Sequence, residues 1–289
     1  MPDLARGCLA LLLAFGVQLG FQAHAQERIV SVGGDITEII YALGAGDRIV
    51  ATDSTSVYPA AANETPKVGY VRRLSAEGVL SVEPDLILVS GAARPEEAVA
   101  QIRASGVRLI EMEPTYTIDF IIEKTRAVAA VLGLDAQGAA FAAQIERDWE
   151  TAERKIKALD IAPSVLFFAT LPDGAPRGAG TDTAADGVIR LLGGRNVFKD
   201  HSGYKSLSLE AAVAADPDII LVMSHHADRI GGVEAVYNHP AISLTTAAQK
   251  RRIFFVDQVT VMQFGPRTPQ ALADLADEIA KTQADHDDS

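Results

Sequence analysis

An internal repeat is the feature of this chain that most constrains its fold. Residues 74–89 read LSAEGVLSVEPDLILV and residues 207–222 read LSLEAAVAADPDIILV, with eight of sixteen positions identical at an offset of 133 residues. Each copy has a Ser suited to cap a helix, a Glu in the first helical turn, a Pro-Asp pair and a strand of the buried type. Two copies of one helix–strand unit predict two similar lobes.

Strands and helices alternate around both copies of the repeat. Short apolar strands are expected at 28–32, 86–89 and 107–111, with helices between them, and the same alternation resumes after Pro163. This order is typical of an α/β fold whose mainly parallel sheets are covered by helices. We therefore expect two Rossmann-like lobes with mainly parallel sheets.

A long helix between the two repeats is expected to join the lobes. Its apolar residues recur at three- and four-residue spacing, as on a helix with one buried face. They are Ala140, Phe141, Ile145, Trp149, Ala152 and Ile156. The predicted division is a signal peptide (1–25), an N-terminal lobe (26–135), the linker helix (136–160), a C-terminal lobe (161–282) and a disordered tail (283–289).

The first 25 residues predict export. Arg6 precedes an apolar run, and Ala23-His24-Ala25 fits the small-x-small rule for signal cleavage, so we expect cleavage after Ala25. Cys8 is the only cysteine, and it stands before the apolar run rather than after it, unlike the cysteine of a lipid-anchored protein. A soluble exported chain without disulfide or thiolate chemistry is the expected product.

Composition and motifs exclude several function classes. The formal net charge of −12 is the opposite of the basic footprint that nucleic acid requires. The chain has no nucleophile elbow, P-loop or H-E-x-x-H motif, and its Gly-x-Gly at 44–46 follows a helix instead of a strand. We expect no enzyme.

The adjacent histidines His225 and His226 are the only paired candidates for metal binding. Imidazole suits zinc or iron, but a zinc site needs three or four converging ligands. If the chain after the strand 219–223 is extended, the two rings point to opposite sides and at most one faces a cleft. A solvated or cleft-lining pair is favoured over a dedicated metal site.

Tyr70 is the residue with the most distinctive setting, since Arg72 and Arg73 follow it just before the first repeat helix. One interpretation is a tyrosine packed at a domain edge with a solvated hydroxyl. The other is a phenolate ligand to ferric iron, because tyrosine is an established axial haem ligand. A free phenol titrates near ~10, and a nearby Arg favours its anionic form. On an extended segment Arg72 would share the side of Tyr70.

A ligand is expected in a crevice between the two lobes. In parallel α/β sheets ligands bind beyond the carboxyl ends of the strands. The loops expected there are 33–35, the Tyr70 loop, 90–94, 171–183, the histidine loop at 224–228 and 259–264.

The chain resembles the periplasmic haem-binding proteins of bacterial haem-uptake ABC transporters. The resemblance spans about residues 28–280, and its most specific part is GYVRRLSAEGVLSVEPDLILVSG at 69–91. Further matching segments are AGTDTAADGVIRLLGG (179–194), YKSLSLEAAVAADPDIILVM (204–223) and FGPRTPQALADLA (264–276). The resemblance implies a class III periplasmic binding protein, with two lobes joined by a single long helix.

The resemblance also implies roles for named residues. Tyr70 matches the iron-ligating tyrosine of the family, Arg72 matches the arginine beside it, and Arg73 is expected to assist. Glu77 and Glu210 match the glutamates, one per lobe, that dock onto arginine pockets of the permease. The ligand implied is ferric haem b, and the partners are an inner-membrane permease with its ATPase and an outer-membrane receptor upstream. A monomeric periplasmic carrier is expected.

The number of haems, the second iron ligand and the identity of the ligand each have alternatives. Some relatives carry a histidine in the loop after the first strand of the second lobe, whereas residues 169–174 here read ATLPDG, which favours one haem over two. His225 or His226 is a candidate second iron ligand, and Tyr204 can line the cleft. A ferric-siderophore or cobalamin carrier of the same architecture is the alternative function, and an exported domain without a ligand is a third. A single linker helix predicts little lobe movement on binding.

Overall fold

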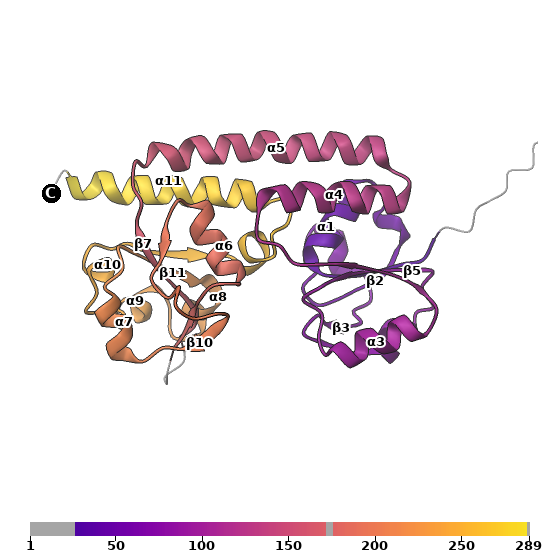
Figure 1. Cartoon of the computed structure of the whole chain (residues 1–289), viewed down its shortest axis with the longest axis horizontal. Helices are drawn as coiled ribbons and strands as arrows, with labels where there is room; N and C mark the ends of the chain where they lie inside the picture. Colours follow the sequence, from indigo (N-terminus) through magenta and orange to yellow (C-terminus); the bar gives the residue numbers. More distant parts are fainter. Residues whose placement is uncertain (1–26, 172–175, 288–289) are drawn as a thin grey trace, which may run out of the picture.

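The computed structural model describes residues 27–171 and 176–287, with the side chains of 285–287 left out. Two lobes lie side by side beneath a long helix, α5 (Asp135–Ala158), as Figure 1 shows. The predicted signal peptide, its cleavage site, Cys8 and part of the loop at 169–174 lie outside the described residues.

The N-terminal lobe is built on a four-stranded parallel sheet. Its strands follow the order β2-β1-β5-β6: β2 (Ile49–Thr52), β1 (Ile29–Val32), β5 (Leu86–Ser90) and β6 (Arg108–Met112). Because successive side chains of a strand face opposite sides, Val30 and Ile87 pack towards α2 (Ala76–Leu80) and α3 (Glu96–Ala104). Ile29 and Leu86 pack towards α1 (Gly34–Ala42) and α4 (Ile118–Leu132). The central strands β1 and β5 are thereby buried on both faces.

The C-terminal lobe has a mixed sheet with a parallel centre. Its main path is β10-β8-β7-β11-β12, and β9 pairs with β7. The strands are β7 (Ser164–Thr170), β8 (Arg177–Ala179), β9 (Arg195–Asn196), β10 (Tyr204–Ser206), β11 (Ile219–Met223) and β12 (Ile253–Val256). The pairs β10–β8 and β8–β7 are antiparallel, and the pairs β7–β11, β11–β12 and β7–β9 are parallel. The prediction of mainly parallel sheets is confirmed.

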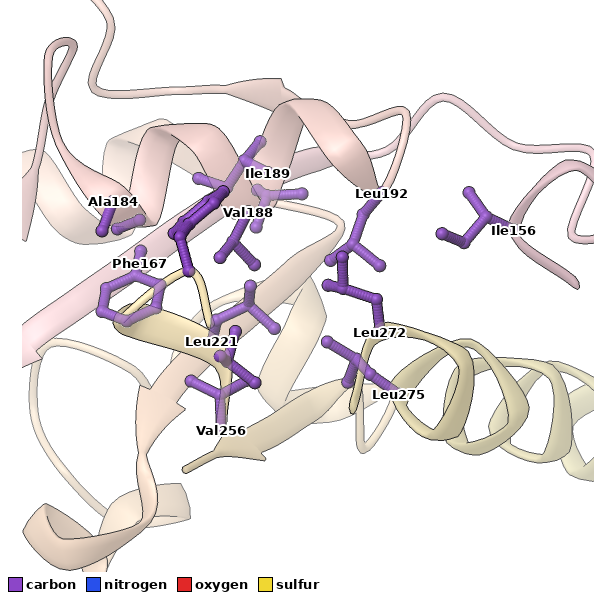
Figure 2. Packing of buried hydrophobic residues seen from close by; sticks show 14 of the residues in the cluster. Ile156, Phe167, Ala184, Val188, Ile189, Leu192, Leu221, Val256, Leu272 and Leu275 are labelled. Atoms are coloured by element: carbon purple, nitrogen blue, oxygen red, sulfur yellow. The ribbon is translucent and has the colours of Figure 1, made fainter. Parts of the chain in front are cut away.

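Helices cover both faces of this second sheet. Phe167 and Leu221 pack against α6 (Ala184–Leu191) and α11 (Thr268–Asp287), and Figure 2 shows this cluster. Leu166 and Ile220 face the opposite side, where four short helices lie. These are α7 (Leu209–Ala215), α8 (Ser224–Arg229), α9 (Val233–Tyr237) and α10 (Thr246–Gln249).

The repeat forms equivalent structures in the two lobes. The first copy is α2 followed by β5, and the second is α7 followed by β11. Ser75 caps α2 by accepting a hydrogen bond from the Gly78 amide at 3.2 Å, and Ser208 caps α7 by accepting from the Ala211 amide at 3.1 Å. The repeat therefore predicted both lobes and both caps.

The predicted linker helix is confirmed as α5, which packs along α4 of the first lobe and α11 of the second (Figure 1). The predicted disordered tail is wrong for residues 283–287, because α11 continues through them as helix to Asp287. None of the helices in the described part of the chain is both long enough and apolar enough to cross a membrane.

Candidate functional site

A cleft of about 280 Å³ lies between the lobes, at the carboxyl ends of the parallel strands. The N-terminal lobe contributes Gly34, Tyr70, Arg72 and Ser90 among others. The C-terminal lobe contributes the start of α6, Tyr204, Met223 and the π-helical segment 258–262. The cleft is therefore a shared site of both lobes, as the sequence predicted.

Tyr70 lies at the end of a small hairpin on the N-terminal wall. Strand β3 (Gly69–Tyr70) pairs antiparallel with β4 (Arg73–Leu74), so Tyr70 is directly opposite Arg73 and the two residues between them form the turn. Cross-strand neighbours have Cβ atoms about 5 Å apart. Tyr70 is half-buried and lines the cleft, whereas Arg73 is exposed and is not among the lining residues.

The extended segment expected from Tyr70 to Arg72 is wrong, because residues 71 and 72 turn the chain back on itself. Arg72 stands at the tip of the turn and lines the cleft. Burial raises the pKa values of the Tyr116 and Tyr204 phenols, and the nearby charge of the Arg72 guanidinium opposes that rise in both. Arg72 therefore directs positive charge across the cleft.

The opposite wall is formed by Tyr204 at the amino end of α6. Its phenol lies close to the Ala185 main chain and the Thr183 side chain, both of which act to lower its pKa. Burial raises the pKa of Tyr204, the phenol of Tyr116 adds to this rise, and the charge of Arg72 opposes it. Tyr204 thus remains a neutral phenol at physiological pH.

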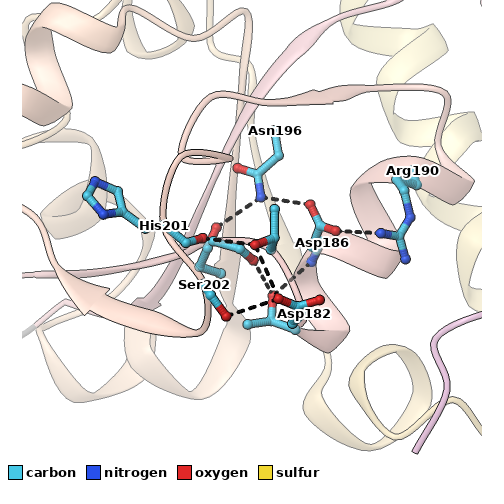
Figure 3. A network of polar contacts seen from close by, with 10 residues as sticks. Asp182, Asp186, Arg190, Asn196, His201 and Ser202 are labelled. Carbon is cyan, nitrogen blue, oxygen red and sulfur yellow. Dashed lines mark hydrogen bonds and ion pairs between the residues drawn. The ribbon is translucent and has the colours of Figure 1, made fainter.

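A polar network holds this wall in place (Figure 3). The Asn196 amide donates to the Ala179 carbonyl at 3.1 Å and to the buried carboxylate of Asp186 at 3.0 Å. Arg190 pairs with the same carboxylate at 2.6 Å. Ser202 donates to Asp182 at 3.0 Å, which ties the segment before Tyr204 to the cleft-lining residue Asp182.

Tyr116 is a cleft residue that the sequence interpretation missed. Tyr116 lies between β6 and α4, and its ring centroid is 5.3 Å from that of Phe264. Its backbone packs closely on α6, since a Cβ added to Gly187 would lie 2.5 Å from the Cβ of Tyr116. Burial raises the pKa of Tyr116, and the charge of Arg72 opposes that rise. The rule that ligands bind beyond the carboxyl ends of strands could have found it, because it follows β6.

The other predicted loops also line the cleft, with one exception. Ser90 and Ala92, Asp182 and Thr183, and Met262 and Gln263 are lining residues. The histidine loop at 224–228 is the exception. Neither His225 nor His226 lines the cleft, although Met223, just before the loop, does.

The histidine pair lies on a helix and not on an extended segment, so the expectation of opposed rings is wrong. His225 and His226 begin α8, and their ring centroids are 4.1 Å apart. Burial lowers the pKa of His226, the charges of His225 and Arg229 add to this, and a hydrogen bond to the main chain of Ala169 opposes it. In the described part of the chain, no three His, Cys, Asp or Glu side chains gather as a metal site requires.

Glu77 and Glu210 occupy equivalent exposed positions in the first turns of α2 and α7. The pKa of Glu210 is lowered by a hydrogen bond from its own main chain and by one from Ser208. Both glutamates thus lie in a first helical turn, as the repeat predicted, and both are exposed to solvent.

Comparison with known proteins agrees with this geometry. The apo form of the periplasmic heme-binding protein RhuT from Roseiflexus sp. RS-1 is 40% identical, with a TM-score of 0.83, and the match covers 89% of this chain and 99% of that one. The periplasmic heme-binding protein BhuT, solved with two hemes, is 35% identical, with a TM-score of 0.83 and coverage of 89% and 98%. The vitamin B12-binding protein of Yersinia pseudotuberculosis is 29% identical over 220 residues, 76% of each chain.

Two lobes, one connecting helix and a shared cleft define a class III periplasmic binding protein. The chain belongs to the periplasmic binding protein family, which matches it over residues 29–260. Proteins of this family are the substrate-binding components of ABC transporters, so a permease and an ATPase are the partners of the class.

Proposed function

We propose that this protein is a periplasmic carrier that binds ferric haem b in the inter-lobe cleft and delivers it to an inner-membrane ABC permease. The observation that carries the proposal is the placement of Tyr70 and Arg72 on one hairpin turn inside the cleft. The similarity to RhuT and BhuT supports the same ligand. In this role the protein catalyses no reaction, and ATP hydrolysis belongs to the partner.

Tyr70 is the best candidate for the axial iron ligand among the three cleft tyrosines. A phenolate is a hard anionic donor suited to ferric iron, and tyrosine serves as an axial haem ligand in other proteins. Burial raises the pKa of both Tyr116 and Tyr204, which makes them poor phenolate donors. Tyr70 is half-buried and has Arg73 directly across the hairpin.

The cleft offers both kinds of contact that a haem requires. Aromatic and thioether side chains, namely Tyr116, Tyr204, Met223 and Met262, present apolar surface to a porphyrin. Arg72, which lines the cleft, and Arg73, which lies beside it on the hairpin, are exposed guanidiniums that can pair with propionate carboxylates. His225 or His226 as a second ligand finds no support, because neither lines the cleft.

Delivery is proposed to use one glutamate from each lobe. Glu77 and Glu210 are exposed and related by the repeat, so a permease with two basic pockets can engage both lobes at once. Export to the periplasm, an outer-membrane receptor upstream and a monomeric state belong to the same proposal. They rest on the character of the first 25 residues and on the likeness to periplasmic proteins.

Cobalamin is the second candidate ligand, favoured by the likeness to a vitamin B12-binding protein. The higher identity to two heme-binding proteins and the Tyr70–Arg72 turn favour haem. We propose one haem per chain, although the 35% identical BhuT was solved with two.

An absorption titration with ferric haem tests the proposal. Wild-type apo protein is expected to give a saturable Soret band with the charge-transfer bands of a phenolate-bound ferric haem, and an endpoint at one equivalent. Tyr70→Phe should lose those charge-transfer bands and bind at least about tenfold more weakly, equivalent to ~1.4 kcal/mol. Tyr237→Phe is the control, since that phenol lies on α9 and bonds the Arg251 carbonyl.

Each outcome separates the candidates. A wild type that gives no saturable band with haem but binds cyanocobalamin would overturn the haem proposal in favour of cobalamin. Identical spectra for wild type and Tyr70→Phe would keep haem as the ligand and assign the iron ligand to another residue.

A further inference from the structure

We propose that Asp53 is a positioning residue that holds the Tyr70–Arg73 turn in its binding geometry. The inference rests on the proposed function, because its purpose is to place Tyr70 against the iron. Asp53 directly follows β2 and its side chain is fully buried. A fully buried carboxylate is unusual unless its oxygens are satisfied by partners.

The Asp53 carboxylate accepts five hydrogen bonds from three separate loops. Oδ1 accepts from the Gly33 amide at 2.9 Å and from the Ser56 hydroxyl at 3.0 Å. Oδ2 accepts from the Thr55 amide at 3.0 Å, from the Thr55 hydroxyl at 2.7 Å and from the Val71 amide at 3.3 Å. One side chain therefore connects the loop after β1, the loop after β2 and the turn beside Tyr70.

The bond to Val71 fixes the residue between Tyr70 and Arg72. The Val71 carbonyl accepts from the Arg94 amide at 2.8 Å, so both main-chain polar groups of Val71 are bound. On the other side of Tyr70, the Gly69 carbonyl accepts from the Ser54 amide at 2.8 Å. Both neighbours of Tyr70 are thus tied to the segment that contains Asp53.

A carboxylate suits this position better than an amide. All five partners are donors, and a carboxylate is an acceptor only, whereas the amide of Asn offers one acceptor oxygen and an NH₂ group that donates. In Asp53→Asn the NH₂ group would face amide donors at one of the two oxygen positions. A buried donor left without an acceptor is costly, so the turn is expected to loosen.

The decisive experiment is a double-mutant cycle on haem binding with Asp53→Asn and Tyr70→Phe. Asp53→Asn alone should bind ferric haem about tenfold more weakly and lose part of the phenolate charge-transfer intensity. In the Tyr70→Phe background, the same Asp53→Asn change should weaken binding by clearly less than tenfold, because only the contacts of Arg72 and Arg73 then depend on the turn. Thr37→Val is the matched control, since Thr37 is equally buried and bonds Ser31, Ser56 and the Gly33 carbonyl but not the turn.

An unchanged spectrum and affinity in Asp53→Asn would overturn the proposal. So would an equal loss in both backgrounds, because Asp53 would then act on binding without Tyr70. An equal loss in Thr37→Val would show a general effect of the buried network and would also overturn it.

Hydrogen exchange tests the inference without haem. In the wild-type protein the Val71 amide should exchange at least roughly a hundredfold more slowly than an open turn amide, because its acceptor is buried. Asp53→Asn should accelerate exchange at residues 69–73 and leave α5 unchanged. Fast exchange of Val71 in the wild type would overturn the positioning role, whereas a failure of haem binding alone would count against only the proposed function.

Discussion

The ion pair between Lys124 and Asp35 is the most deeply buried charge pair of the described chain, with side chains 2% and 11% exposed. Lys124 belongs to α4 and Asp35 to α1, both in the N-terminal lobe. The ammonium group of Lys124 also donates to the Phe264 carbonyl of the C-terminal lobe at 2.9 Å. One lysine thereby neutralises a buried carboxylate and links the two lobes beside the cleft.

Removal of that lysine is predicted to destabilise the protein strongly. Lys124→Ala leaves Asp35 buried without its counter-charge and the Phe264 carbonyl without its donor, so the free energy of unfolding should fall by ~3–5 kcal/mol. Urea denaturation followed by circular dichroism measures the change. Arg126→Ala on the same helix is the control, because its pair with Glu146 is exposed and should be worth less than ~1 kcal/mol. Equal losses in the two variants would contradict the argument.

At the level of single residues, the sequence predicted which side chains line the cleft better than it described their geometry. Tyr70 and Arg72 could be found because their neighbours mark a helix start and because the charge pattern is unusual. The position of Arg73 opposite Tyr70 could not be predicted, because it depends on a two-residue turn. In that turn the Val71 amide donates to Asp53 and the Val71 carbonyl accepts from the Arg94 amide. Such long-range partners leave no local pattern in the sequence.

Among the elements, the packing of α5 against α4 depends on Gly138. A Cβ at this position would lie 2.2 Å from the Cβ of Ala129, far inside van der Waals contact. The first turns of α5 can therefore approach α4 closely only because position 138 has no side chain.

Gly138→Ala is predicted to lower the free energy of unfolding by ~1–3 kcal/mol, because the two helices must separate. Alanine normally stabilises a helix by up to ~1 kcal/mol relative to glycine. The sign of the change in unfolding free energy therefore tests whether the close packing outweighs this preference. Gly78→Ala in α2 is the control, since the nearest atom to a Cβ there is the Val68 carbonyl oxygen at 3.4 Å. Chemical denaturation of both variants should give opposite signs, and stabilisation by Gly138→Ala would contradict the packing argument.

The elements themselves were largely predictable where periodicity was strong. The linker helix, the Ser-capped helices and the buried parallel strands follow from apolar spacing and capping residues. The helix at His225 was missed because Ser224–Arg229 is too short to show a periodic pattern. The extension of α11 to Asp287 was missed because polar composition was interpreted as disorder, although a helix already started can continue through polar residues.

In the whole molecule, the lobes are connected by α5 and by side chains that cross their boundary. Arg267, just before α11, pairs with Glu38 of α1 at 2.9 Å and lies over the ring of Tyr58 at 3.7 Å. Together with Lys124, these contacts support the expectation of a small lobe movement on binding. That expectation stays a prediction.

The Glu38–Arg267 pair gives the stability of the molecule a predictable dependence on pH. Burial raises the pKa of Glu38 above its usual value of 4.5, while the hydrogen bond and charge of Arg267 oppose the rise. The native state therefore binds this proton more tightly than the unfolded state does. The contribution of Glu38 to stability is complete below pH 4.5 and is lost as the pH rises through the pKa of the folded protein.

Glu38→Gln removes this titration, so the comparison of variant and wild type isolates it. The unfolding free energy of the wild type minus that of Glu38→Gln should decrease between pH 4 and pH 8, by ~1.4 kcal/mol for each unit by which the pKa is raised. Glu234→Gln is the control of opposite sign, because the hydrogen bond and charge of Arg251 lower the pKa of the exposed Glu234. A difference for Glu38→Gln that grows with pH would mean that attraction to Arg267 outweighs burial. The Glu38–Arg267 pair would then stabilise the folded protein most when Glu38 is ionised.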